Sequence, residues 1–186
     1  MQGGAWYREG TMANAMRLVI AAALGLALAG CGYHLVGTAN TLPEGVSTLY
    51  VERFQNQTNY TDMDQRLDEA LSLEWVRRRR LQLVDERASS DLVLSGVILN
   101  LVVAPVRFDE QGRATEYMMT LTTSVKLFDN RASEPKLLWE DLAFARRNSY
   151  EVDPNAADYF DRQVLAMDQI ADDYSAALVS AVLEGF

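Results

Sequence analysis

Residues 116–128 alternate apolar and polar side chains, and this pattern constrains the fold more than any other feature of the chain. One set comprises Tyr117, Met119, Leu121, Val125 and Leu127. The other set comprises Glu116, Thr120, Thr122, Ser124 and Lys126. Successive side chains of a β-strand point to opposite faces, so a period of two predicts a strand with one buried and one solvated face.

Four further stretches are predicted to be strands. They are 47–54, 81–84, 91–103 and 137–147. The stretch 91–103 is apolar in both alternating sets, as expected of a central strand that is covered on both sides, and Pro105 is predicted to end it. Polar turns are predicted over 55–60, 109–112 and 129–135.

Two stretches repeat apolar residues at helical spacing. The first is predicted to begin at Thr61, which has capping-box spacing to Asp64, and to end in Arg77–Arg80. Its apolar stripe is Met63, Leu67, Ala70, Leu71 and Trp75, widened by Leu73 and Val76. The second is predicted to begin with Asp153 as N-cap and Pro154 at the first helical position. Its stripe is Phe160, Val164, Met167, Ala171, Tyr174, Leu178 and Val182.

The order of these elements is a strand, a helix, a run of strands and a final helix. Grouped strands favour the α+β class. We therefore predict a small, mostly antiparallel sheet with two helices packed on one face. The predicted domain covers residues 46–186.

The N-terminal part of the chain is predicted to be a targeting segment rather than an element of the fold. Arg17 is followed by the uncharged run 18–28, which is shorter than the roughly 20 apolar residues of a membrane-spanning helix. Leu28-Ala29-Gly30 then precedes Cys31, the only cysteine. This arrangement resembles the lipobox of bacterial lipoproteins, in which the cysteine thiol is acylated and becomes the first residue of the mature protein.

Three expectations follow from this resemblance. Residues 1–30 would be a signal peptide, with Met12 and Met16 as alternative starts, and residues 31–45 a lipidated tether. Gly32, in place of aspartate after the cysteine, favours the outer membrane, facing the periplasm. The alternative is that Cys31 is a small buried residue near a hydrophobic helix.

The charge of the chain limits its partners. The net charge is −9, and loss of residues 1–30, which hold Arg8, Glu9 and Arg17, leaves the remainder one unit more negative. Nucleic-acid binding needs many Lys and Arg contacts to phosphates, so we expect no nucleic-acid partner. An acidic chain is also not attracted to an anionic membrane, so the lipid on Cys31 is predicted to provide the attachment.

The sequence predicts no catalytic set, no metal site and no cofactor. The single histidine, His34, lies in the predicted tether without a nucleophile nearby. There is no glycine-rich phosphate loop and no histidine–carboxylate spacing suited to zinc. We therefore expect a protein that is not an enzyme.

The run Arg77, Arg78, Arg79 and Arg80 is the most basic feature of this acidic chain. One interpretation is that it compensates the helix C-terminus and is solvated. The other is that it contacts phosphates, which arginine binds through paired N–H donors. Arg107, Arg113, Arg146 and Arg147 are candidates to join such a site.

Several blocks resemble, in order, the LptE family of lipopolysaccharide (LPS) assembly lipoproteins. They are Cys31–Gly37, Leu42-Pro43, Leu49–Val51 with Phe54, Asn56 and Thr58, Ala88–Gly96, Ala114–Tyr117, Leu138-Trp139 and Tyr150. The resemblance extends over the chain from Cys31 onward and implies two helices packed on a small sheet.

The resemblance also implies a role without catalysis. Proteins of this family plug the LptD β-barrel of the outer membrane, help it assemble, and bind LPS during delivery to the cell surface. The implied partners are therefore LptD, LPS and, through acylated Cys31, membrane lipid. The alternative is a free periplasm-facing lipoprotein that binds another envelope protein or a small ligand.

Overall fold

The computed structural model describes residues 42–156 and 159–184. The predicted signal peptide, Cys31 and His34 lie outside these residues. The elements in chain order are β1 (Thr48–Val51), β2 (Gln55–Asn56), α2 (Met63–Arg78), β3 (Gln82–Leu83), the short 3₁₀ helix η1 (Arg87–Ser89), β4 (Leu92–Phe108), β5 (Ala114–Asp129), β6 (Lys136–Glu151) and α3 (Tyr159–Glu184). This order confirms the predicted α+β class.

The sheet is mixed, which corrects the prediction of a mostly antiparallel sheet. Its strand order is β3-β1-β4-β5-β6, with β2 beside β4. The long strands β4, β5 and β6 form an antiparallel meander, but β1 pairs in parallel with both β3 and β4, and β2 pairs in parallel with β4. Helix α2 is the cause, since a crossover helix returns the chain so that the next strand runs parallel to the first.

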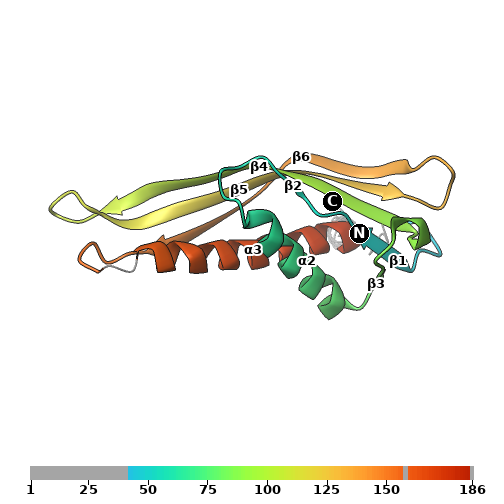
Figure 1. Ribbon diagram of the computed structural model, residues 1–186, viewed down its shortest axis with the longest axis horizontal. Helices are drawn as coiled ribbons and strands as arrows, with labels where there is room; N and C mark the ends of the chain where they lie inside the picture. The colour runs from blue at the N-terminus through green and yellow to red at the C-terminus, as the bar shows by residue number, and fades with distance from the viewer. Residues whose placement is uncertain (1–41, 157–158, 185–186) are drawn as a thin grey trace, which may run out of the picture. The chain divides into compact units, whose positions relative to one another are not determined.

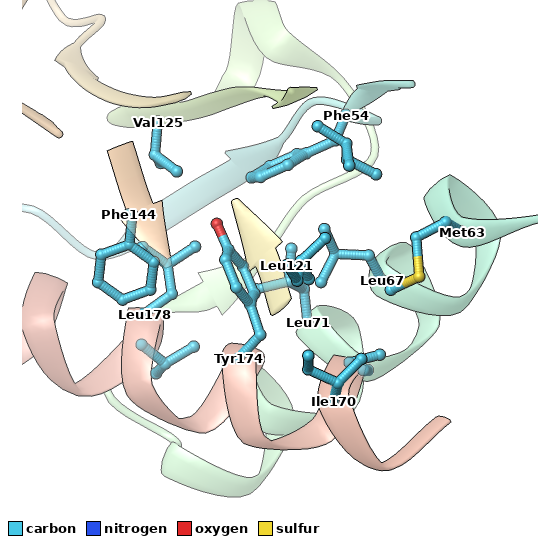
Figure 2. Packing of buried hydrophobic residues seen from close by; sticks show 14 of the residues in the cluster. Phe54, Met63, Leu67, Leu71, Leu121, Val125, Phe144, Ile170, Tyr174 and Leu178 are labelled. Carbon is cyan, nitrogen blue, oxygen red and sulfur yellow. The ribbon is translucent and has the colours of Figure 1, made fainter. Parts of the chain in front are cut away.

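Both helices cover the same face of the sheet, as predicted (Figure 1). The core lies between the two layers, and Figure 2 shows side chains of α2, α3 and the sheet meeting there. Leu67 and Leu71 of α2, Ile170 and Leu178 of α3, and Leu121 of β5 are all at most 1% exposed. The burial of these side chains supplies the main driving force for joining the layers.

The alternation predicted for β5 is confirmed, with one polar residue on the buried face. Met119, Leu121, Val125 and Leu127 are buried, and Thr123 is buried between them. The Thr123 hydroxyl lies 2.6 Å from the hydroxyl of Tyr174 on α3, and it donates to the backbone oxygen of Phe144 at 3.3 Å. Burial raises the pKa of Tyr174, which keeps this phenol neutral.

Replacing Tyr174 with phenylalanine is expected to destabilise the domain by about 1 kcal/mol. The ring keeps its packing, but the hydrogen bond to Thr123 is lost inside the core. Chemical denaturation of Tyr174→Phe and the wild type measures the difference. The double variant Thr123→Val, Tyr174→Phe tests whether the two hydroxyls interact directly. If its loss of stability equals the sum of the losses in the two single variants, a direct contact is contradicted.

Strand β4 continues through Pro105 to Phe108, so the prediction that Pro105 ends it is wrong. β2 pairs with β4 only as far as Ile98. Beyond that residue, β5 is the one described strand that pairs with β4, and its register shifts between Pro105 and Arg107. A proline is tolerated in an edge strand because its missing N–H can face away from the paired neighbour.

Helix α2 begins at Met63, two residues after the predicted start at Thr61. The capping box expected from Thr61 and Asp64 is not formed, since the N-cap residue is Asp62 and makes no side-chain capping bond. The Asp62 carboxylate instead accepts hydrogen bonds from Arg66 one turn later. This hydrogen bond, with the attraction of the guanidinium, holds the pKa of Asp62 below its usual value.

Helix α3 also begins later than predicted. The Asp153 carboxylate accepts the N–H of Asn155 at 2.8 Å, and the Asp153 carbonyl accepts the N–H of Ala156 at 3.0 Å. These bonds close a turn that holds Pro154 and Asn155, so these two residues do not begin the helix. The described helix starts at Tyr159, whose ring packs against Tyr117 of β5, while Phe160 is 76% exposed and does not contribute to the core.

Candidate functional site

The predicted site residues Arg77–Arg80 lie at the end of α2 and do not form a free cluster of four cations. Arg77 Nη1 lies 3.1 Å from Glu74 Oε2, and Arg78 Nε lies 2.7 Å from Glu74 Oε1. The Glu74 side chain is 8% exposed, so its charge is taken out of water and needs these partners. The carboxylate of Glu74 therefore neutralises part of the run.

Arg78 connects the two helices. Its Nη2 donates to the Ser180 hydroxyl of α3 at 2.8 Å, and its Nη1 lies 3.7 Å from Glu184 Oε1. Arg79 ends the helix in the left-handed conformation with φ of 52°, and its backbone N–H donates to the Trp75 carbonyl at 3.3 Å. Within the run, Arg78 thus has a structural role, and the exposed side chains are those of Arg77, Arg79 and Arg80.

Glu74 lies on the buried face of α2, which the sequence pattern identifies from apolar residues alone, so Glu74 was not predicted. Leu67, Ala70 and Leu71 are buried, and the next positions on that face are Glu74 and Trp75. Leu73 and Val76, predicted to widen the stripe, are 65% and 64% exposed. Glu74 stands three positions before Arg77 and four before Arg78, and this helical spacing could have revealed the buried ion pair.

The other candidate arginines do not join Arg77–Arg80. Arg107 pairs with Glu116 and Glu151, and Arg113 pairs with Asp109 beside the turn between β4 and β5. That turn lies away from the end of α2 (Figure 1).

Arg146 and Arg147 belong to the middle of β6. The Arg146 guanidinium carbon lies 4.7 Å from the ring centre of Phe144, while Arg147 is exposed. The structure therefore offers several separate cationic positions and does not bring them together into one phosphate site.

An acidic surface between the two helices was not predicted. Arg66 of α2 pairs with Asp62 at 2.8 Å and also with Asp168 of α3. Asp168, Glu69 and Asp172 line the groove between the helices together with Leu73. The contact joins residues that are far apart in sequence, so periodicity alone could not have found it.

A polar pocket of about 180 Å³ lies where β2 meets the sheet. It is lined by Glu52, Arg53, Gln55, Ser95, Gly96, Val97, Ser124 and Lys126. The hydroxyls, amide and charged groups could hold a small polar molecule, but they include no nucleophile paired with a base.

Two further properties concern only the described part of the chain. Residues 42–156 and 159–184 hold no cluster of at least three histidine, cysteine or carboxylate side chains suited to a metal ion. In the same residues, none of the helices combines the length and the apolar character needed to cross a bilayer.

Comparisons with solved structures place this fold among known ones. The hypothetical protein CT253 from Chlamydia trachomatis is 12% identical with a TM-score of 0.51, over 74% of this chain and 98% of that one. At this identity the match shows a shared fold alone. Rare lipoprotein B from Shewanella oneidensis is 17% identical with a TM-score of 0.42, over 73% and 96% of the two chains. Lipoprotein B from Nitrosomonas europaea is 23% identical with a TM-score of 0.40, over 82% and 96%.

Sequence comparison with protein families gives the decisive result. No curated protein sequence matches the chain. The family model described as LptE, lipopolysaccharide-assembly, matches residues 46–182, which includes both helices almost entirely and every strand of the sheet. The predicted family resemblance is confirmed, and the chain belongs to the LptE family of lipopolysaccharide-assembly proteins.

Proposed function

We propose that this LPS-assembly protein is an outer-membrane lipoprotein that plugs the LptD β-barrel, helps it assemble and assists LPS delivery to the cell surface. The observation that carries the proposal is the family match over residues 46–182. The lipobox-like sequence ending in Cys31 supports attachment to the membrane through an acylated thiol. In this role the protein acts by binding and shape and not as an enzyme.

The surface of the described domain is compatible with the interior of a barrel. The lumen of an outer-membrane barrel is polar, so a plug has to present polar groups rather than the apolar surface that faces lipid. Helix α3 exposes Asp161, Asp168, Asp172 and Asp173 on the side away from the core. A barrel wall that receives this surface would carry complementary basic or hydrogen-bonding groups.

Affinity isolation of the full chain, extracted from native membranes in mild detergent, tests this proposal. We expect a large outer-membrane β-barrel to be recovered in equal molar amount. Recovery of the chain without a barrel, or with a different envelope protein, would instead support the alternative of a free periplasm-facing lipoprotein.

We further propose that Arg77, Arg79 and Arg80 contact phosphate groups of LPS. Arg78 is left out because its guanidinium joins Glu74 of α2 to Ser180 of α3. Arg77 also contacts Glu74, but its side chain is 77% exposed. Changing the three exposed arginines to glutamine is expected to weaken LPS binding about tenfold at low salt, and less at high salt, where surface charges are screened. Binding to purified LPS at two ionic strengths measures the effect.

The control for this prediction is Arg78→Gln. It removes one positive charge from the same run but breaks the contacts between α2 and α3. We expect this variant to lose thermal stability while its LPS affinity changes little. Unchanged LPS binding by the triple variant would leave helix termination and solvation as the role of the run.

A further inference from the structure

Strand β6 is a long free edge of the sheet. It covers Lys136–Glu151 and ends the strand order, with β5 as its one strand neighbour among the described residues. No proline interrupts it. An edge strand presents a row of backbone N–H and C=O groups that can pair with another strand, and proteins usually limit this by bulges and charges.

The charges of β6 are arranged in two opposite pairs around its middle. Glu140 and Asp141 lie on one side of Phe144, and Arg146 and Arg147 lie on the other. Glu140 and Arg147 are separated by an odd number of positions, as are Asp141 and Arg146. In an unbroken strand, members of such pairs would point to opposite faces of the sheet.

A bulge between Asp141 and Phe144 changes this outcome. Val125 of β5 pairs with Asp141, but Thr123, only two residues away, pairs with Phe144, so β6 contains one extra residue there. Glu140 pairs with Lys126 and Arg147 with Thr120, which places both on the face away from the helices. Asp141 and Arg146 both fall on the helix-covered face.

This arrangement is self-complementary. If two copies of β6 pair antiparallel about a two-fold axis at Phe144, residue 145 of each lies opposite the bulged residues 142–143 of the other. Asp141 then lies opposite Arg146 of the second copy, and Glu140 opposite its Arg147, each on a matching face. Opposite charges directly across an antiparallel pair are favourable, and the two-fold axis forms every pair twice.

We propose that β6 binds a second copy of this chain, in antiparallel pairing centred on Phe144, so that the two sheets become continuous. The occupant is a second copy because, in antiparallel pairing, the acidic pair of one β6 lies opposite the basic pair of the other. Leu142, which is 61% exposed, would be covered in the pair. The proposal rests on β6 alone and does not depend on binding to a barrel.

The contacts at this edge within one chain predict a reversible association. Asp141 Oδ1 accepts the N–H of Ala143 at 2.8 Å, and Arg146 Nη1 donates to the carbonyl of Ala145 at 2.8 Å. Glu140 has a long contact to Lys126, at 3.9 Å. Asp141 and Arg146 therefore shield part of the edge in the single chain, and pairing exchanges these bonds for bonds to the second copy.

Charge reversal tests the proposal with the full chain in detergent, by sedimentation equilibrium over a range of concentrations. The wild type is expected to form dimers as concentration rises. Glu140→Arg places two arginines opposite each other, and Arg147→Glu places two glutamates opposite each other, so each variant alone should dimerise at least about tenfold more weakly.

Mixing the two variants is the decisive step. In a heterodimer, each of the two pairs between positions 140 and 147 again joins an acidic side chain to a basic one. We expect the mixture to dimerise like the wild type. Glu110→Arg, the same charge change in the exposed turn between β4 and β5, is the control and should behave as the wild type.

Circular dichroism verifies that each variant is folded. If a reversal unfolds the domain, Glu140→Gln and Arg147→Gln replace it and should each weaken the dimer. A wild type that stays monomeric at every concentration, or a mixture no more dimeric than its components, would overturn the proposal.

Discussion

Replacing Gly96 with alanine is expected to destabilise the domain by about 3 kcal/mol, the upper end of the usual cost of overpacking a core. A Cβ atom at this position would collide with three ring carbons of Phe54. The ring is 3% exposed, and the residues that follow it, Gln55 and Asn56, pair with Val97 and Ile98 of β4. The ring therefore cannot withdraw without breaking this strand pairing. Urea denaturation measures the loss.

A double-mutant cycle separates this collision from a general weakening of β4. Phe54→Ala alone is expected to cost about 3–5 kcal/mol, because a buried ring is removed. Adding Gly96→Ala to that variant should cost little more, since the ring that blocked the new methyl group is gone. Fully additive losses would show that the glycine is required for another reason.

Replacing Cys31 with alanine is expected to leave an uncleaved precursor without a lipid. The thiol is the group that the predicted lipidation modifies, and cleavage is predicted to follow acylation at this residue. Cell fractionation with intact-mass measurement of the chain tests this. His34→Ala, three residues further along the predicted tether, is the control and should be processed normally.

A Cys31→Ala chain that still fractionates as a mature outer-membrane protein would refute the predicted attachment. An unchanged thiol in the wild-type chain from cells would do the same. Either result would leave the family membership intact, because the family match begins at residue 46.

The parts of the fold that sequence could predict are those fixed by local periodicity. The alternation in β5 identified its buried face, and the stripes through Leu67, Leu71 and Tyr174 identified the buried faces of both helices. These patterns repeat over many residues, so they also specify which side of an element faces the core.

The ends and pairings of elements depend on contacts that periodicity does not contain. Pro105 stays within β4 because that segment lies at an edge, which follows from where β2 ends. The parallel pairing of β1 follows from the crossover through α2. Asp153 lies in a turn, although its carboxylate accepts the N–H of Asn155 as an N-cap residue would, so the capping pattern does not fix where the helix begins.

The candidate site was predicted only in part for the same reason. The run Arg77–Arg80 is predicted to end a helix. Its pairing with Glu74 lies within α2 at helical spacing, but the contact of Arg78 with Ser180 depends on how α2 packs against α3. The self-complementary charges of β6 depend on a bulge, which becomes visible only in the pairing with β5. Side chains that meet through tertiary packing carry no common signal along the chain.

Native mass spectrometry of the complex extracted from outer membranes tests the central claim most directly. The account predicts a barrel protein bound in a one-to-one ratio to this chain, and the mass of the chain corresponds to a start at Cys31 with attached acyl groups. A chain with a free thiol at residue 31 and no barrel bound would contradict it.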